Sequence, residues 1–90
     1  MSYEYKVTEK FWENFYALSD SQKASVREKW KIFKDNPFDP ILRSHKINVL
    51  SAYARHTIYS VVIEANLRVL FRIDENTITS LDVGTHNLYQ

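Results

Sequence analysis

The sequence predicts an α+β fold in which one strand is followed by two helices and then by a three-stranded antiparallel meander. Alternating apolar residues at 3–7 indicate a short strand, and aromatic residues at helical spacing across 11–33 indicate two helices. β-Branched and aromatic residues across 57–83, broken by polar turns, indicate three strands. Helices in one half of the chain and strands in the other are typical of a sheet with its helices on one face. We therefore expect residues 1–90 to form a single domain with two helices packed on one sheet face and the other face partly open.

Capping residues set the expected bounds of the two helices. Thr8 is placed to cap a first helix that begins near Glu9, and residues 19–21 mark a break and a second N-cap. Asn36 and Pro37 end the second helix, because proline disfavours helical geometry in the residue before it. Residues 37–50 are then expected to be a connecting segment.

Two polar turns, at residues 64–66 and 74–76, divide the second half of the chain. In the middle strand, apolar residues alternate with Arg68 and Arg72, so both arginines are expected on the face that carries no helix. Gly84, the only glycine, follows the last strand, where we expect a backbone with positive φ.

Charge is unevenly distributed, although the net charge is only +1. Residues 1–42 hold seven Lys/Arg and seven Asp/Glu, residues 43–72 hold five against one, and residues 73–90 hold none against three. Local basic density attracts phosphate groups, so the middle block is a candidate surface for nucleic acid. The alternative interpretation is that these arginines are ordinary outward-facing side chains of strands and bind no nucleic acid.

The chain has no cysteine, which favours a reducing cytoplasm and excludes thiolate zinc sites and cysteine nucleophiles. The first residues contain no apolar signal-peptide core, and no apolar run reaches membrane-spanning length. We therefore expect a cytoplasmic protein without a membrane partner.

Two histidines, His45 and His86, are candidates for phosphate binding or proton transfer. His45, beside Lys46 in the connector, can bind a phosphate or move a proton near neutral pH, although a solvated loop is the simpler interpretation. His86 follows the last strand and Gly84, where it can act as general acid or base, and Tyr89 can stack on a base. A frayed terminus is the alternative for this segment.

Arg68 and Arg72 complete the set of candidate groups. Four residues apart on a strand they lie roughly 13 Å apart, so they can meet separate phosphates. No metal-binding spacing, phosphate-binding glycine loop or serine-hydrolase turn is present, and no cofactor or metal is expected. RNA cleavage needs none of these, because the ribose 2′-OH is an internal nucleophile and a base, an acid and a cationic clamp suffice.

An ordered set of segments resembles the RelE/ParE toxin superfamily, and within it the YafQ-like toxins, over nearly the whole chain. The segments are Asn36-Pro37-Phe38-Asp39-Pro40, Leu42-Arg43-Ser44-His45-Lys46-Ile47, Tyr59-Ser60-Val61-Val62-Ile63, Leu67-Arg68-Val69-Leu70-Phe71 and Asp82-Val83-Gly84-Thr85-His86.

The resemblance implies the toxin of a type II toxin–antitoxin pair. Such toxins are mostly ribosome-dependent endoribonucleases that cut mRNA in the A site, and a cognate antitoxin silences them by wrapping around them. The family's catalytic positions fall on Arg68, His45, His86 and, approximately, Tyr89. The remaining basic groups would hold mRNA or rRNA: Arg43, Lys46, Arg55, His56 and Arg72.

The sequence also departs from the family pattern. The lysine pair of RelE-type toxins falls on Tyr59 and Val61, a histidine of YafQ-like toxins falls near Val62, and an arginine before the closing Gly-Thr-His falls near Asp82. The alternative function is therefore a ParE-like or catalytically decayed toxin that acts only by binding proteins. A basic RNA-binding or scaffold protein outside toxin biology is a third interpretation.

Overall fold

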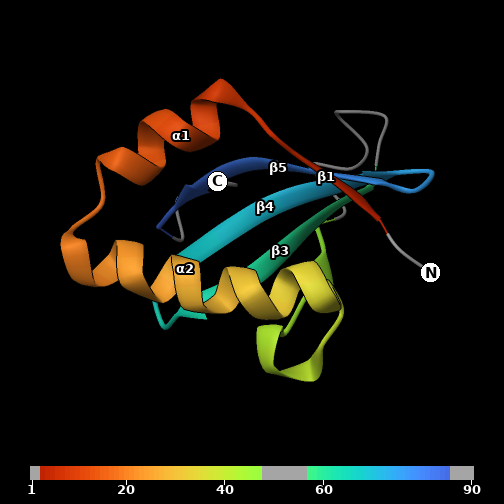
Figure 1. The fold of residues 1–90 in the computed structure, drawn as a ribbon. Coiled ribbons are helices and arrows are strands. Elements are labelled where there is room, and N and C mark those ends of the chain that lie inside the picture. The colour runs from red at the N-terminus through yellow and green to blue at the C-terminus, as the bar shows by residue number, and fades with distance from the viewer. Residues whose placement is uncertain (1–2, 48–56, 86–90) are drawn as a thin grey trace.

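The computed structural model describes residues 3–47 and 57–85, which form a five-stranded sheet with two helices packed against it (Figure 1). In chain order the elements are β1 (Glu4–Val7), α1 (Glu9–Tyr16), α2 (Asp20–Asp35), the 3-10 turn η1 (Pro40–Leu42), β2 (His45–Lys46), β3 (Thr57–Glu64), β4 (Leu67–Asp74) and β5 (Thr77–Gly84). The predicted α+β class and its order of one strand, two helices and a three-stranded meander are confirmed.

Both helices begin at the predicted caps. The Thr8 side chain accepts a hydrogen bond from the Phe11 N–H, and Ser19 and Gln22 form a reciprocal capping box at the start of α2. Helix α2 ends at Asp35, immediately before Asn36 and Pro37, as the sequence predicts.

The strand order in the sheet is β1-β5-β4-β3-β2, and two of its features were not predicted. Strand β1 pairs with β5 in parallel, so the first and last of the described strands lie side by side. The connector is not only a loop, because it contains η1 and the two-residue strand β2, which pairs with β3. A pairing of two residues leaves no periodic pattern from which a sequence could predict it.

The core lies between the helices and one face of the sheet. It joins aromatic side chains of both helices to β3, β4 and β5; for example, the Phe33 ring of α2 lies 4.9 Å from the Phe71 ring of β4. Helix α1 lies over β5 and α2 over β3, as Figure 1 shows. The buried residues of the hydrophobic core are Phe11, Phe15, Val26, Phe33, Leu42, Val61, Ile63, Leu67, Val69, Phe71, Ile78 and Val83.

Tyr5 fastens β1 to the end of α2. Its hydroxyl lies 3.1 Å from the carbonyl oxygen of Phe33 and 2.9 Å from that of Lys34, so it donates to the last turn of the helix. The final carbonyls of a helix have no partner within the helix, and this hydroxyl supplies one. Burial, with a smaller contribution from neighbouring Tyr3 and Asp35, raises the pKa of the Tyr5 hydroxyl.

Strand β5 contains a bulge at Leu81. Leu70 pairs with Asp82 and Phe71 with Ser80, so Leu81 has no residue opposite it on β4. The Leu81 carbonyl accepts a 2.8 Å hydrogen bond from the Thr8 hydroxyl, which anchors the start of α1 at the bulge.

The prediction for Gly84 is wrong, because its φ is not positive. Gly84 still belongs to β5 and pairs directly with Arg68. A residue without a side chain at this position leaves room beside the arginine on the same face of the sheet.

Candidate nucleic-acid interface

The sheet face that carries no helix, called here the helix-free face, is defined by alternate residues of β3 and β4. They are Ile58, Ser60 and Val62 on β3 and Arg68, Leu70 and Arg72 on β4. Because directly opposite residues of an antiparallel pair point to the same side, the register places both arginines on this face. The sequence prediction that Arg68 and Arg72 share the face opposite the helices is confirmed.

The centre of the helix-free face is more enclosed than the sequence suggests. Ile58, Ser60 and Leu70 are buried, whereas Arg68 and Arg72 are half-buried at either end of the β4 row. Arg68 and Arg72 are therefore the side chains of these two strands that are exposed enough to contact the phosphate backbone of a nucleic acid.

Arg68 is held by the turn between β3 and β4. Its Nη1 donates to the carbonyl oxygens of Glu64 at 2.7 Å, Ala65 at 3.1 Å and Leu67 at 3.2 Å. Within the described residues Nε and Nη2 make no hydrogen bond, so one edge of the guanidinium is fixed and the other can bind a phosphate. The turn thus orients the cation.

Two buried polar atoms of this face lack hydrogen-bond partners within the part of the chain that the structure describes. They are Arg72 Nε and Ser60 Oγ. A buried donor without an acceptor is unfavourable, and such groups call for an explanation, commonly a function. Arg72 Nε is therefore a buried donor on this face that no acceptor among the described residues satisfies.

His45 joins the helix-free face from the sheet edge. It pairs with Ser60, which in turn pairs with Leu70, so its side chain points to the same side as the two arginines. Standard strand spacings put its backbone about 12 Å from that of Arg68. The ring is exposed, and its Nδ1 lies 3.3 Å from the Arg43 carbonyl oxygen. An exposed imidazole at this position can exchange a proton with a ligand on the face.

Lys46 and Arg43 do not share the face with His45. Lys46 pairs with Tyr59 and therefore points to the helix side of the sheet. Arg43 is exposed and adopts a left-handed backbone with φ of 49°, where η1 turns into β2. Both cations lie at the sheet edge, so they can touch RNA only at its margin.

Four of the predicted site residues lie outside the described residues: Arg55, His56, His86 and Tyr89. The described chain ends at Thr85, one residue beyond Gly84, and Gly84 is opposite Arg68. The described backbone therefore passes Arg68 at Gly84, and the placement of His86 near Arg68 stays a prediction.

Tyr59 and Val61, the positions onto which the sequence resemblance places a lysine pair, are packing residues. Tyr59 and Val61 face the helices; Val61 is buried, and the Tyr59 ring stacks on Phe71 at 5.2 Å. Val62, half-buried, is opposite Arg68 on the helix-free face. None of the three supplies a charge to the site.

Asp82 has a structural role that sequence reasoning missed. It is only 7% exposed, and its carboxylate accepts a 2.6 Å hydrogen bond from Asn14 Nδ2 and lies 3.3 Å from Lys10 Nζ. Both partners belong to α1, far away in the sequence, so no local pattern connects them. Although Asp82 is opposite Leu70 in the register, its carboxylate contacts tie α1 to β5.

Neither a metal site nor a membrane span was found in residues 3–47 and 57–85. No group of three or more His, Cys, Asp or Glu there could hold a metal ion, and no helix there is long and apolar enough to cross a membrane.

Comparison with known proteins identifies the fold. No family model matches the sequence, and no curated protein matches it. Among solved structures, a chain of the archaeal RelE–RelB complex from Pyrococcus horikoshii OT3 is similar with a TM-score of 0.73, 14% identity and coverage of 98% of this chain and 99% of that one. A chain of the E. coli DinJ–YafQ toxin–antitoxin complex gives 0.77 at 7% identity, with both chains fully covered. The YoeB dimer from Staphylococcus aureus gives 0.69 at 18% identity, with 96% and 99% covered.

These likenesses extend over almost the whole of each chain. They confirm the predicted RelE-like architecture, that is, two helices on one face of a five-stranded sheet that is mostly antiparallel.

Proposed function

We propose that this chain, which has the fold of RelE-type toxins, is the toxin of a type II toxin–antitoxin pair and a ribosome-dependent mRNA endoribonuclease. The single observation that carries the proposal is the pair of arginines on the helix-free face, Arg68, which the β3–β4 turn orients, and Arg72, with His45 in the row between them. Two of the solved structures that this chain resembles are toxin–antitoxin complexes, which supports a cognate antitoxin as partner.

The proposed reaction is attack of the ribose 2′-oxygen on the adjacent phosphorus. A general base takes the 2′-OH proton, a general acid gives a proton to the departing 5′-oxygen, and a cation stabilises the extra negative charge on the phosphate. The products are a 2′,3′-cyclic phosphate and a 5′-hydroxyl end. All atoms come from the RNA, so the reaction requires no cofactor.

The residues divide these tasks as follows in the proposal. Arg68 binds the scissile phosphate through Nε and Nη2, while the β3–β4 turn holds Nη1. His86 serves as one proton-transfer group, His45 serves as the other, and Tyr89 stacks on a base. The remaining cations hold RNA backbone, from the face or its margin: Arg43, Lys46, Arg55, His56 and Arg72.

Induced expression tests the proposal. Growth should stop, and primer extension on cellular transcripts should show new 5′ ends. Arg68→Ala and His86→Ala should each lower the cleavage rate by about 100-fold or more, the usual effect of removing a transition-state group. Lys31→Ala, which removes an exposed cation of α2 on the other side of the sheet, is the matched control and should leave cleavage unchanged. Retained cleavage in the Arg68→Ala, His86→Ala double variant would refute the mechanism.

A non-nuclease toxin is the second candidate function, and one observation favours it. The family's lysine positions are occupied by Tyr59 and Val61, which face the core, and Asp82 is engaged by α1. This candidate predicts growth arrest without new transcript ends, and growth arrest that persists in Arg68→Ala.

A further inference from the structure

The helix-free face continues beyond β4 onto β5 and β1, where it carries one more cation. Arg72 pairs with Thr79 of β5, and Thr79 pairs with Lys6 of β1, so the three residues form one row across the sheet. Residues that are opposite one another on neighbouring strands point to the same side. The register therefore places Lys6 on the same face as Arg72, two strands away.

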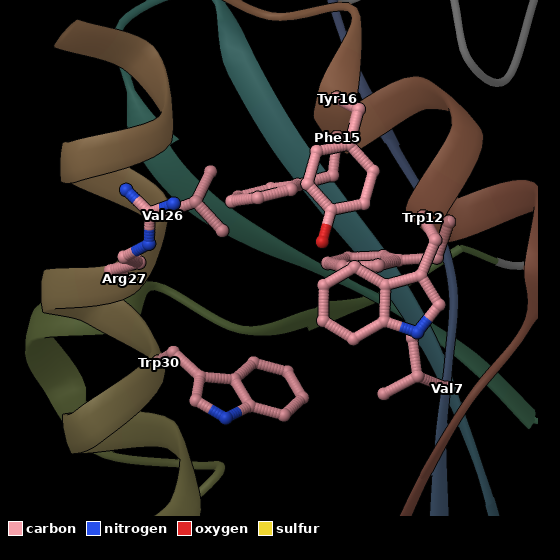
Figure 2. A pocket seen from close by; sticks show the side chains of 8 residues that line it. Val7, Trp12, Phe15, Tyr16, Val26, Arg27 and Trp30 are labelled. Atoms are coloured by element: carbon pink, nitrogen blue, oxygen red, sulfur yellow. The ribbon is translucent and has the colours of Figure 1, made fainter. Parts of the chain in front are cut away.

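The neighbours of Lys6 along β1 lead to the same orientation. Tyr5 and Val7 pack against the hydrophobic core on the helix side of the sheet. Figure 2 shows Val7 among the side chains that line the groove between α1 and α2. Because successive side chains of a strand point to opposite faces, Lys6 points away from the helices. Lys6 is exposed, so its ammonium group is accessible to a ligand on the helix-free face.

Lys6 and Arg72 are close enough to bind the same group. Two strand spacings put their backbones about 10 Å apart, and both side chains are long enough to converge above Thr79. Thr79 is only 8% exposed, and its short side chain does not fill the space between the two cations. An ammonium and a guanidinium on either side of this space can bind one phosphate group between them.

No acid neutralises either cation within the described residues. The salt bridge that is found there joins Lys10 to Asp82, and neither Lys6 nor Arg72 takes part in it. Arg72 Nε is also a buried donor that has no acceptor in this part of the chain. Two cations on one face without a counter-ion favour an anion between them.

Acidic residues mark where this cationic surface ends. Glu4 and Asp74 are exposed and share the next row of the sheet, two residues along their strands from Lys6 and Arg72. They point to the helix-free face, since residues two apart on a strand share a face, and they repel a polyanion there. An RNA strand on this face therefore extends from the Lys6 row toward Arg68.

We propose that Lys6 and Arg72 form a second phosphate site, which holds the mRNA strand at least one nucleotide away from the phosphate that Arg68 contacts. Four residues along β4 separate the two arginines by roughly 13 Å, so they bind separate phosphates. The inference rests on the proposed function for the identity of the RNA, and it adds Lys6 to the interface. The second site binds and positions the strand and takes no part in bond breaking.

The first test is binding of a labelled single-stranded RNA of about 12 nucleotides, followed by fluorescence anisotropy. Lys6→Gln should weaken binding about threefold or more and make the slope of log K against log salt shallower by about 0.7, the value for one phosphate contact on a single strand. Lys31→Gln, the same change at an exposed lysine of α2 on the helix side, is the matched control and should do neither. Lys6 is exposed, so its replacement should leave Tm unchanged.

Double variants test whether Lys6 and Arg72 hold the same phosphate. Lys6→Gln and Arg72→Met together should weaken binding by less than the product of their separate effects, because either change alone already releases the shared phosphate. Lys6→Gln and Arg68→Ala affect different phosphates, so their separate effects should multiply.

Three results would overturn the inference. The first is a wild-type chain that does not bind the oligonucleotide, and the second is a Lys6→Gln variant that binds it as tightly as wild type. If that variant instead binds empty ribosomes more weakly, Lys6 contacts rRNA and the mRNA site is wrong. The third is an effect of Lys6→Gln that multiplies with that of Arg72→Met just as it does with that of Arg68→Ala.

Cleavage of mRNA on ribosomes separates this inference from the proposed function. Lys6→Gln should raise the concentration of the chain needed for half-maximal cutting about threefold or more and leave the maximal rate unchanged, because it removes binding that is equal in the ground state and the transition state. If the wild-type chain cuts and Lys6→Gln matches it in both quantities, the phosphate site is wrong while the nuclease stands. If the wild-type chain does not cut but Lys6→Gln weakens oligonucleotide binding as expected, the nuclease is wrong while the phosphate site stands.

Discussion

Asp82 gives the most quantitative prediction, because its three contacts can be ranked. The carboxylate receives hydrogen bonds from Asn14 Nδ2 at 2.6 Å and from the Val83 N–H at 2.8 Å, and pairs with Lys10 at 3.3 Å. Lys10 is 71% exposed, so solvent screens that pair to about 0.2–1 kcal/mol. A hydrogen bond to a buried charged group contributes about 1.5–3 kcal/mol. The Asn14 contact should therefore dominate.

The perturbations are Lys10→Ala, Asn14→Ala and Asp82→Ala, each measured by urea unfolding followed by circular dichroism. Lys10→Ala should lower the free energy of unfolding by less than about 1 kcal/mol. Asn14→Ala should cost about 1.5–3 kcal/mol, and Asp82→Ala at least as much, because it also leaves the Val83 N–H without its acceptor. In a domain of this size 1 kcal/mol shifts Tm by about 4–8 °C.

Double-mutant cycles isolate the two pairs. The coupling between Asn14 and Asp82 should exceed that between Lys10 and Asp82 by at least about 1 kcal/mol. A larger coupling for Lys10, or an Asp82→Ala variant as stable as wild type, would refute the view that Asp82 fastens α1 to β5.

Three further predictions follow from single side chains. Tyr5→Phe should lower the free energy of unfolding by about 1 kcal/mol near pH 7, measured by urea titration, because the carbonyls at the end of α2 lose a donor. The raised pKa of Tyr5 means that its proton is held more tightly in the folded state, so its contribution is complete below about pH 10 and is lost as pH rises through the folded pKa; the stability difference between wild type and Tyr5→Phe should shrink there. Ser60→Ala should leave stability unchanged or raise it, since the buried hydroxyl has no partner among the described residues, and a thermal melt that fell by more than about 5 °C would contradict this. Arg72→Met should reduce the salt dependence of RNA binding by about one counterion, measured as the slope of log K against log salt, without lowering stability; an unchanged slope would remove Arg72 from the interface.

The fold was predictable where it depends on local patterns. Thr8 and Ser19 mark the two helix starts, and alternation along β4 correctly assigns Arg68 and Arg72 to one face. Features that depend on distant pairing were not predictable: the parallel contact of β1 with β5, the bulge at Leu81 and the two residues of β2. Nothing in a short strand's own sequence specifies which strand it joins.

The candidate site was predictable in its residue types more than in its geometry. The register places His45 on the same face as the arginines and Lys46 on the opposite side of the sheet. Neither placement could be predicted from the fact that the two residues are adjacent in the sequence. The hydrogen bonds from Arg68 to the β3–β4 turn have no sequence signature, because their acceptors are backbone carbonyls that any residue provides. Asp82 resembles a lost catalytic position in the sequence and is an anchor of α1 in the structure.

The central claim, that the helix-free face cleaves RNA on the ribosome, is tested most directly in a reconstituted translation reaction. Purified wild-type chain and Arg68→Ala are added to ribosomes stalled with a defined codon in the A site, and mRNA ends are mapped. We predict a cut within that codon that requires both the ribosome and Arg68. Translation blocked by the wild-type chain with every mRNA intact would contradict the account.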